Sequence, residues 1–543
     1  MPEILRGTIC AQFESSAERF FNRPFLHIPL QACNKYSPSA IEFTYQEMLA
    51  EVQNLVCRYG ETGYGTGYRV ALLLENRAEF FQHFLALNAL GACVVPINPD
   101  NTVSEMAYVI ENSKISLLVC LPDHVDKAGS AVESSRSPVK IAWVDEQSLP
   151  GPSCKRDTGT QQSVGGLPAA ILYTSGTTGK PKGCVLSNDF FFCVGNWYVG
   201  IKGHLSMDEG SERAITPLPL FHTNALTWTM MAMMMNGGCI IQLDRFHPSS
   251  WWETVRDSKA TIIHYLGVMP AMLMGMEKTD AEYNPGIKFG FGAGVEPDLH
   301  ARFEERFGFP LIEGWSMTET GAAGVVMCTE DPRHVGQRCM GRAAQGMEFK
   351  VVDDTGMPVS PGEAGEFLVR RLGKDPAYGF FTEYFGNPAA TEEAWKGGWF
   401  HTGDVVRANE EGILFFIERK KNIIRRSGEN IAAMEVESVL LDCAGVVNCA
   451  VAPVPDPIRE EEVAACIILD EGTSPNKETA EGIVRFCLEK ISYFKVPGYI
   501  YFCDRLPLTS TQKIQRGEQR KLCLELYEKE LFLDFRSAKK KNH

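Results

Sequence analysis

The stretch "RVALLLENRAEFFQHFLALNALGACVVPIN" (residues 69–98) has the pattern of a strand, a helix and a second strand. Residues 69–74 are mostly apolar, residues 76–91 carry apolar side chains at helical spacing and end on glycine, and residues 93–98 form another short apolar run. Two neighbouring strands joined by a helix pair in parallel through a right-handed crossover. The stretch therefore predicts an α/β fold built on a parallel sheet.

The same alternation extends beyond this unit. Residues 114–121 predict a further strand, and the strand–helix rhythm resumes after residue 166. Between them, residues 129–166 are rich in Ser, Gly and Pro, which predicts a loop between subdomains. Residues 349–417 instead alternate short strands with turn residues, a pattern typical of β-hairpins. We therefore expect a large N-terminal domain of αβ subdomains with an added β-rich subdomain.

A loop dense in small and hydroxylated residues follows one of the apolar runs. The stretch "YTSGTTGKPKG" (residues 173–183) holds three glycines, four Ser or Thr hydroxyls and two lysines. Hydroxyl and ammonium groups beside flexible backbone amides are donors suited to phosphate oxygens. We therefore expect a loop that closes over a triphosphate, with Lys180 and Lys182 supplying positive charge.

Two other interpretations fit this loop less well. A Walker A loop requires Ser or Thr after Gly-Lys, but Pro181 follows Lys180, and Thr174 stands where the first glycine is needed. Proline also removes an N–H from the place where a helix N-terminus would bind phosphate. A plain surface turn explains the glycines but not the density of hydroxyls and lysines.

Composition limits the class of protein. The chain has 543 residues, of which 44% are hydrophobic and 22% charged, as in a globular protein of more than one domain. Its net charge of −15 disfavours general binding of nucleic acids. The 17 cysteines include no C-x-x-C pair, so we expect no disulfide framework and a reducing, cytoplasmic location. The N-terminus lacks the apolar core of a signal peptide.

One uncharged stretch, residues 225–243, is long enough to be weighed as a membrane span. Asn-Gly-Gly at residues 236–238 divides it into a Met-rich helical part and a short strand-like part. We therefore expect a buried helix–turn–strand unit and no integral membrane segment.

Seven motifs in order resemble those of the adenylate-forming superfamily, which includes acyl-CoA synthetases, adenylation domains and firefly-type luciferases. After "YTSGTTGKPKG" come "GWSMTETG" (314–321), "GEAGEFLVR" (362–370), "GWFHTGD" (398–404), "ERKKNIIRRSGENI" (418–431), "YFKVP" (493–497) and "LPLTSTQKIQR" (506–516). The resemblance covers nearly the whole chain. It implies an N-terminal domain over residues 1–418, a hinge at residues 419–421 and a small mobile α+β domain over residues 422–543.

The resemblance implies that ATP activates a carboxylate, giving an acyl-adenylate and pyrophosphate. Trp315 would stack on adenine, where most relatives have Tyr, and Thr318 would donate to the α-phosphate. Glu319 would help to hold Mg²⁺, which prefers oxygen ligands. Asp404 would accept hydrogen bonds from both ribose hydroxyls, and Arg419 would reach the ribose as well.

The C-terminal motifs imply a catalytic lysine and a hinge. Lys513 would neutralise the charge that develops between the carboxylate and the α-phosphate, although Gln512 precedes it where relatives usually have Gly. Lys421 matches the hinge position, about which the small domain would turn between adenylation and thioester formation. Gly428 lies in the "RRSGEN" segment that would serve the second step.

The site residues implied by the resemblance fall into four groups. The catalytic residues are Lys513, Thr318, Glu319 and His222. The metal ligands are Glu319 and Thr174. The residues that bind ATP and CoA are Thr174, Ser175, Gly176, Thr177, Thr178, Lys182, Gly292, Ala293, Gly294, Gly314, Trp315, Ser316, Asp404, Arg419, Lys421 and Gly428. The acyl site, where His222 would gate the entry of pantetheine, would include Asn224, Trp228, Gly267, Val268, Met269 and residues 322–324.

The wider pattern looks nearest to enzymes of the crotonobetaine/carnitine-CoA ligase type. We therefore expect an AMP-forming acid–CoA ligase that uses ATP, Mg²⁺ and coenzyme A on a short or medium acid. A betaine would gain a cation–π contact from Trp228 or Trp315. No carrier segment with a phosphopantetheine serine follows the last domain, which favours free CoA. A carrier-loading enzyme, a luciferase-like oxygenase and a weakly active nucleotide- or acyl-CoA-binding protein remain alternatives, and the chain would be a monomer or homodimer.

Overall fold

The computed structural model describes residues 4–157, 163–174, 180–283, 286–295, 297–353, 355–419, 423–507 and 516–539. The chain divides into two units. The larger unit comprises Met1–Pro99, Ala107–Leu172 and Gly183–Glu418, and the smaller comprises Asp100–Met106, Tyr173–Lys182 and Arg419–His543.

The predicted strand–helix–strand unit is confirmed. β3 (Arg69–Leu73) pairs in parallel with β4 (Cys93–Pro96), with Val70 opposite Val94, and α4 (Ala78–Ala89) connects them. Both strands are buried along almost their whole length, which explains why their sequences are continuous apolar runs. Their sheet has the order β18-β8-β7-β4-β3-β5-β6. The other strands are β5 (Leu117–Cys120), β6 (Lys140–Trp143), β7 (Pro168–Thr174), β8 (Lys182–Ser187) and β18 (Glu383–Tyr384).

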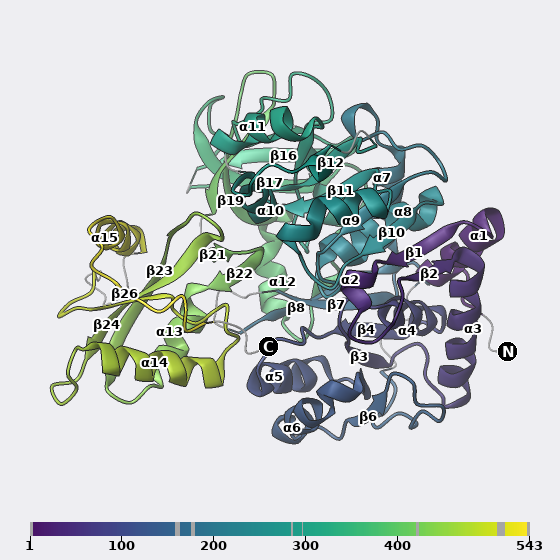
Figure 1. The fold of residues 1–543 in the computed structure, drawn as a ribbon, viewed down its shortest axis with the longest axis horizontal. Helices are drawn as coiled ribbons and strands as arrows, with labels where there is room; N and C mark the ends of the chain where they lie inside the picture. Colours follow the sequence, from purple (N-terminus) through teal and green to yellow (C-terminus); the bar gives the residue numbers. More distant parts are fainter. Residues whose placement is uncertain are drawn as a thin grey trace. The chain divides into compact units, whose positions relative to one another are not determined.

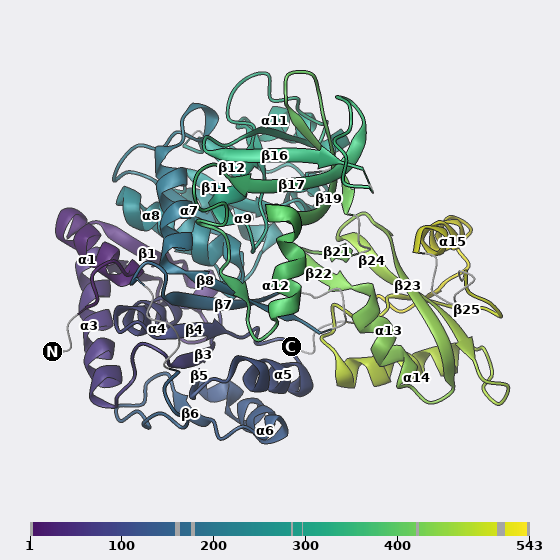
Figure 2. The same ribbon diagram turned by 180° about the vertical axis from the view of Figure 1, so that it is seen from behind.

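A second sheet of the larger unit changes from parallel to antiparallel across its width. The parallel strands, in order, are β13 (Leu311–Trp315), β12 (Phe289–Ala293), β11 (Ile262–Leu266), β9 (Arg213–Thr216), β10 (Cys239–Gln242) and β1 (Pro24–Ile28), with β2 (Ile41–Thr44) antiparallel at the edge. Beyond β13 lie β14 (Val326–Met327), β15 (Cys339–Ala343), β20 (Leu414–Arg419), β19 (Phe400–Ala408), β17 (Ala364–Arg371) and β16 (Met347–Val352). Most of the predicted short strands of residues 349–417 belong to this second part, where β16, β17 and β19 lie side by side (Figure 2). The prediction is incomplete, because β18 joins the first sheet and a helix, α12, lies within the same range.

Helices pack against these sheets, and side chains at their N-termini fix several of their starting points. Thr44 and Glu47 form a capping box at the start of α3, and Ser187 caps α7. Besides α4, the helices of the larger unit are α1 (Ile9–Phe20), α2 (Leu30–Cys33), α3 (Tyr45–Glu61), α5 (Val103–Ser113), α6 (Val125–Ser135), α7 (Asn188–Gly200), α8 (Met230–Asn236), α9 (Trp251–Asp257), α10 (Val268–Met274), α11 (Pro297–Phe307) and α12 (Pro388–Ala394). The first residues of α5 belong to the smaller unit.

The predicted loop over residues 129–166 is wrong in its first part, because α6 and β6 occupy it. Ala128 and Ala131 are fully buried and three residues apart, so small side chains form the packing face of α6. The helix ends where Arg136 adopts a left-handed conformation with φ of 55°. The helix was not recognised from the sequence, because its buried face consists of small residues and the segment around it is rich in Ser and Gly.

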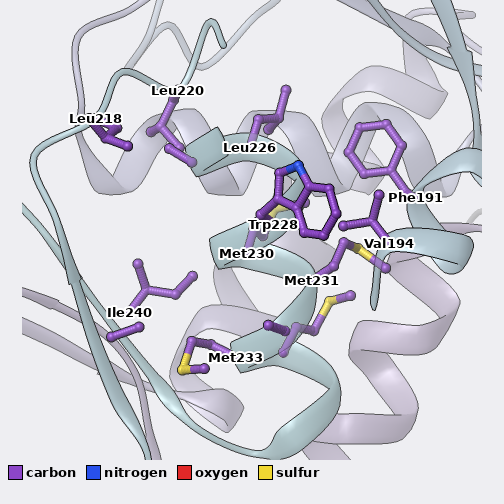
Figure 3. Close-up of a cluster of buried hydrophobic side chains, with 14 of the residues drawn as sticks. Phe191, Val194, Leu218, Leu220, Leu226, Trp228, Met230, Met231, Met233 and Ile240 are labelled. Atoms are coloured by element: carbon purple, nitrogen blue, oxygen red, sulfur yellow. The ribbon is translucent and has the colours of Figure 1, made fainter. Parts of the chain in front are cut away.

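The uncharged stretch of residues 225–243 forms the predicted helix–turn–strand unit. A π-helical turn at Asn224–Thr229 leads into α8, Gly237 closes the helix with φ of 70°, and β10 follows. A side chain at Gly237 would come within 2.5 Å of the Phe20 ring. Figure 3 shows the apolar cluster that buries this unit around Trp228. In the part of the chain that the structure describes, no helix is both long and apolar enough to cross a membrane.

The smaller unit is a sheet with helices on both faces (Figure 1). Along β23 (Val446–Asp456), Cys449 and Val451 pack in one apolar cluster with α13 (Ala433–Leu441) and α14 (Lys477–Lys490). Ala450 and Ala452 pack in another cluster, with α15 (Arg516–Glu528). Because successive residues of a strand face opposite sides, the two clusters lie on opposite faces of the sheet, and the smaller unit has three layers: helices, sheet and helix. The other strands are β21 (Ile423–Arg426), β22 (Glu429–Ala432), β24 (Glu460–Leu469), β25 (Tyr499–Phe502) and β26 (Leu533–Asp534).

We predict that His264 makes the larger unit sensitive to acid. Its ring nitrogens hydrogen-bond with the Tyr198 hydroxyl at 2.9 Å and with Thr229 Oγ1 at 2.6 Å, and complete burial lowers its pKa from 6.5 to about 3. The unfolded chain therefore takes up a proton below pH 6.5 that the folded chain refuses, so stability is full above pH 6.5 and falls as the pH drops toward 3. Between pH 7.5 and pH 5 this loss is about 2 kcal/mol.

Urea unfolding followed by tryptophan fluorescence checks this, since Trp228 packs against Tyr198. His264→Gln keeps a neutral hydrogen-bonding group, so its stability should fall about 2 kcal/mol less than that of the wild type over the same pH interval. Equal losses in the two proteins would contradict the assignment.

Candidate active site

A buried carboxylate lies where the parallel and antiparallel parts of the second sheet are joined. Asp404 on β19 is 1% exposed, and its Oδ2 accepts a hydrogen bond of 2.8 Å from the indole Nε1 of Trp315 at the end of β13. The Asp404 backbone N–H donates to Thr402 Oγ1, which in turn donates to the carbonyl of Phe367. The Trp315 ring meets the edge of Phe367, with ring centroids 4.8 Å apart. Two residues 89 positions apart in the sequence are thus held as one unit.

A second carboxylate follows four residues after Trp315. Glu319 is 7% exposed, and its Oε1 accepts a hydrogen bond of 2.8 Å from the Tyr384 hydroxyl of β18. Its backbone carbonyl accepts from the N–H of Phe381 at 2.8 Å. Thr318, beside it, is half-buried. The side chain and backbone of Glu319 are therefore both fixed by the segment that leads into β18.

The Gly-rich segment at the end of β12 has little space around it. A side chain on Gly292 would come within 2.2 Å of the Tyr265 carbonyl oxygen, and Gly294 has a φ of +82°. Glu313 Oε1 accepts the backbone N–H groups of Gly294 and Val295 at 3.1 and 2.9 Å. Burial raises the pKa of Glu313. A glycine at 292 is required by packing, and Glu313 fixes the loop that follows.

The expected acyl site is assembled around α7. Trp228, in the π-helical turn, is 5% exposed and meets Trp197 of α7 edge-on at 5.5 Å and Phe291 of β12 at 5.9 Å. α7 also contacts the short 3-10 turn Gly321–Gly324. His222 stands just before the π-helical turn, beside Phe221. The structure therefore brings the π-turn, β12 and the 322–324 segment to one helix, and their place in an acyl site stays a prediction.

Asn224, at the start of the same turn, has an enclosed Oδ1 that accepts no hydrogen bond from the residues the structure describes. Buried amide oxygens are normally paired, so this atom is a candidate ligand contact. The expected neighbours Gly267, Val268 and Met269 form the start of α10, where Val268 and Met269 are buried.

In the smaller unit, Gly428 lies in the tight turn between β21 and β22 with φ of +84°. Beside the turn, Arg426 Nε pairs with Glu462 at 2.9 Å, and Lys539 Nζ pairs with the same carboxylate at 2.6 Å. Burial and the nearby Arg426 lower the pKa of Lys539 to about 7. This buried ion cluster holds the "RRSGEN" turn in place.

Several predicted site residues cannot be compared with the structure. Ser175, Gly176, Thr177, Thr178, Lys421, Lys513 and Gln512 lie outside the described residues. Thr174 ends β7 and Lys182 begins β8, so these two positions border the predicted phosphate loop. Arg419 ends β20, and its side chain is not described. Gly314 and Ser316 flank Trp315, and Ser316 Oγ donates to the Gly321 carbonyl at 3.0 Å.

The described residues fit a nucleotide and a magnesium ion. Asp404 is a buried acceptor oriented by a neutral donor, which suits ribose hydroxyls, and Glu319 presents a carboxylate suited to Mg²⁺. Within the described residues, no three His, Cys, Asp or Glu side chains are grouped to hold a metal ion. Mg²⁺ commonly binds one or two carboxylates together with phosphate oxygens and water, and one glutamate is consistent with that mode.

Three contributions were missed from the sequence. Tyr384 acts on the site through a hydrogen bond to Glu319, and Glu313 acts through two hydrogen bonds from the backbone of Gly294 and Val295; no local pattern marks either residue. In the Arg426–Glu462 ion pair, Arg426 belongs to the recognised motif of residues 418–431, but Glu462 belongs to none of the seven motifs. Glu313 directly precedes "GWSMTE", so an acidic residue at the end of an apolar strand was the available signal.

Comparison with protein families gives two matches. Residues 13–378 match the family described as AMP-binding enzyme, and residues 435–513 match its C-terminal domain. Crotonobetaine/carnitine–CoA ligases of Shigella sonnei and of Escherichia coli strain SE11 are each 28% identical over 488 residues, covering 87% of this chain and 92% of each relative.

Solved structures with the same fold cover most of the chain. A double mutant of o-succinylbenzoate CoA synthetase from Bacillus subtilis has a TM-score of 0.79 at 24% identity, covering 94% of this chain and 98% of that one. An amide bond synthetase from Marinactinospora thermotolerans has a TM-score of 0.78 at 23% identity, covering 94% and 99%. A malonyl-CoA ligase, in a complex with methylmalonyl-CoA and AMP, has a TM-score of 0.72 at 24% identity, covering 90% and 97%. These likenesses confirm the predicted fold class.

We predict that the Trp315 indole positions Asp404 for ribose. Trp315→Phe keeps an aromatic face but removes the donor, and a hydrogen bond to a charged group contributes roughly 1.5–3 kcal/mol. The Kd for ATP should therefore rise about tenfold or more, while the Kd for 2′-deoxy-ATP, which lacks one ribose hydroxyl, should rise less. Titration calorimetry with both nucleotides measures the change.

Trp252→Phe is the matched control, because Trp252 is a buried indole packed on Phe307 and Phe309. It should leave the ratio of the two dissociation constants unchanged. If Trp315→Phe also leaves that ratio unchanged, the indole serves only to pack.

Proposed function

The chain belongs to the AMP-binding enzyme family, and from this premise we propose that it joins a carboxylic acid to coenzyme A at the expense of ATP. In the first half-reaction an oxygen of the acid attacks the α-phosphorus of ATP, the α–β bond breaks and pyrophosphate leaves. In the second, the CoA sulfur attacks the acyl carbon and AMP leaves. The superfamily predicted from the seven motifs is confirmed by the family match.

One observation carries the proposal: the indole of Trp315 and the carboxylate of Asp404 form a buried, hydrogen-bonded pair. Glu319 follows Trp315 by four residues. A flat ring, a ribose acceptor and a carboxylate for Mg²⁺ are the elements that hold a nucleoside triphosphate by its base, sugar and phosphates. Such a cradle positions the α-phosphate for in-line attack, and positioning supplies much of the rate in phosphoryl-type transfers.

The roles of individual residues follow from their chemistry. Glu319, held by Tyr384, would keep Mg²⁺ beside the phosphates, where the ion neutralises negative charge. Thr318 would donate to the α-phosphate. Lys513 would offset the charge that develops as the two anions approach, and Lys180 and Lys182 would bind the departing pyrophosphate. In the second step, the turn at Gly428 would face the thiol of CoA, and His222 would control the entry of that thiol to the acyl site.

We infer a short acid, because Trp228 takes up volume at the expected acyl site. Its indole is enclosed by Trp197, Tyr198 and Phe291, so it supplies bulk more than an open aromatic face. The two carnitine-type relatives support an acid bearing a quaternary ammonium group. Asn224 Oδ1 is an acceptor, so it would face the positive ammonium end or a hydroxyl of such an acid and not its carboxylate.

We place the reaction in the cytoplasm, with ATP, Mg²⁺, CoA and the acid as its small-molecule partners. All 17 cysteines are free thiols, which suits a reducing compartment. The amide bond synthetase shows that this fold accompanies another acceptor in another protein, so fold alone does not select CoA.

Release of AMP tests the proposal. With purified protein, ATP, Mg²⁺ and a panel of short, medium, long and aromatic acids, AMP should form only when CoA is added, and fastest with short or betaine-type acids. AMP formation with amines or a carrier protein but not with CoA would overturn the proposal that CoA is the acyl acceptor. Exchange of pyrophosphate into ATP with long-chain or aromatic acids alone would overturn the substrate class.

We further predict that Lys513→Ala separates the two half-reactions. Loss of a charge that stabilises the transition state should lower adenylation about 100-fold or more, whereas thioester formation from supplied acyl-adenylate should be largely retained. Lys521→Ala is the matched control, because Lys521 is an exposed lysine of α15 that pairs with Glu518. Equal loss of both steps in Lys513→Ala would refute its assignment to adenylation.

A further inference from the structure

Two cysteine side chains meet behind the nucleotide-binding strands. Cys328 follows β14 and Cys339 begins β15, and these strands pair antiparallel. Both cysteines line one small cavity, together with residues of α11, β13 and the intervening segment. Cys328 packs against the apolar cluster that Cys339 forms with Ile413 and Phe415. The two thiols are therefore neighbours, eleven positions apart in the chain.

The two thiols are chemically different. Cys339 is 4% exposed, whereas Cys328 is only half-buried. A hydrogen bond from the Cys339 thiol lowers the pKa of Cys328 against the opposing effect of burial, and the positive Arg333 lowers it further. The same hydrogen bond, with burial, raises the pKa of Cys339. Cys328 is thus the more acidic and more accessible thiol, and a protonated thiol stands beside it.

Other charges around the pair come from each element packed against it. Arg333 is held by Glu304 of α11, and Asp331 is an exposed carboxylate in the same segment. Glu313 of β13 acts on Cys339 and favours its protonated form. His300 of α11 lies between Glu304 and Glu313. The positive charge of Arg333 therefore acts on Cys328, and the negative charge of Glu313 acts on Cys339.

The segment between the cysteines, residues 328–339, holds two elements of the candidate active site, and we name it the clasp. Arg333 donates two hydrogen bonds of 2.6 Å to Glu304 of α11 and one of 3.3 Å to the Leu311 carbonyl of β13. The N–H of Gly336 donates to His300 Nδ1 at 3.4 Å. α11 follows the Gly292–Gly294 segment, and β13 ends at Trp315. A change in the conformation of the clasp would therefore shift α11 and β13, and with them the segment and the ring where adenine is expected to bind.

We propose that Cys328 and Cys339 are a modification site at which a peroxide converts two thiols into a disulfide, and that this closes the clasp into a covalent ring and weakens nucleotide binding. The site itself is independent of the proposed function, and its effect on ATP rests on that function.

The reaction balances with one peroxide. The Cys328 thiolate attacks one oxygen of hydrogen peroxide, the O–O bond breaks, and the departing hydroxide takes a proton to become water. The Cys339 sulfur then attacks the sulfur of the Cys328 sulfenic acid, the S–S bond forms and the S–O bond breaks. The departing hydroxide takes the proton of the Cys339 thiol and leaves as a second water. Two thiols lose two electrons, and the peroxide gains them. Cellular dithiols reverse the bond by exchange.

Another cysteine pair provides an internal comparison. Cys466 and Cys523 have sulfurs 3.7 Å apart, but both are completely buried in the smaller unit. A peroxide in solution therefore does not reach them while the protein is folded. The half-buried Cys57, on α3, is a solitary thiol for comparing rates of alkylation.

Peptide mapping tests the site. The full chain is treated with hydrogen peroxide, blocked with iodoacetamide and digested with trypsin, which cuts after Arg333 and Arg338 and so separates the two cysteines. The wild type should yield a linked pair of peptides that is lighter by two hydrogen atoms and is released by dithiothreitol. Cys339→Ser should stop at a sulfenic acid on Cys328 that dimedone traps, Cys328→Ser should give neither product, and Cys466→Ser should still give the link.

Failure to form the link, or alkylation of Cys328 no faster than that of Cys57, would overturn the site. Calorimetry with ATP tests the consequence: oxidation should raise the Kd of the wild type about fivefold or more, with recovery in dithiothreitol and no change in Cys328→Ser. A disulfide without a change in Kd refutes the effect on nucleotide binding. A disulfide in a protein that ligates no acid refutes the proposed function and leaves the modification site standing.

Discussion

The hydrogen bond from the Trp315 indole to the Asp404 carboxylate is the contact on which the candidate site depends. A buried carboxylate is costly unless donors compensate for lost water, and here a neutral N–H at 2.8 Å does so from the neighbouring part of the sheet. The bond joins β13, the last parallel strand, to β19 in the antiparallel part, across the strands between them. In this sheet the parallel part carries the aromatic ring, and the antiparallel part carries the carboxylate.

Local patterns made most of the fold and the site motifs predictable from the sequence. Continuous apolar runs such as residues 69–74 mark strands buried on both faces, and the glycine at 237 ends a helix where it was expected. The helix at Val125–Ser135 was missed because alanine and serine carry little hydrophobic signal even when they form the packed face. Tyr384 and Glu313 were missed for another reason, since their hydrogen bonds to the site exist only after the sheets have assembled.

Glycines in this site have two physical origins that a sequence cannot separate. Gly292 was expected to allow a ligand to approach, yet the atom that excludes a side chain there is the Tyr265 carbonyl oxygen of the adjacent strand. Gly314 is similar, because a side chain would meet Met327 of β14 within 2.5 Å. Gly294 differs, since its φ of +82° demands glycine whatever lies nearby. The glycines at 292 and 314 are therefore explained by tight packing between strands, without any need for space for a nucleotide.

The buried carboxylates Asp404, Glu319 and Glu462 accept from different kinds of donor. In the larger unit, Asp404 accepts from an indole and Glu319 from a phenol, and neutral donors orient a carboxylate without cancelling its charge. In the smaller unit, Glu462 is completely buried between the cations Arg426 and Lys539, which balance its charge inside the protein. A carboxylate that must attract a metal ion or ribose hydroxyls needs direction but must retain its negative potential. The contrast is consistent with the proposed binding roles of Asp404 and Glu319, and it indicates that Glu462 supports the "RRSGEN" turn.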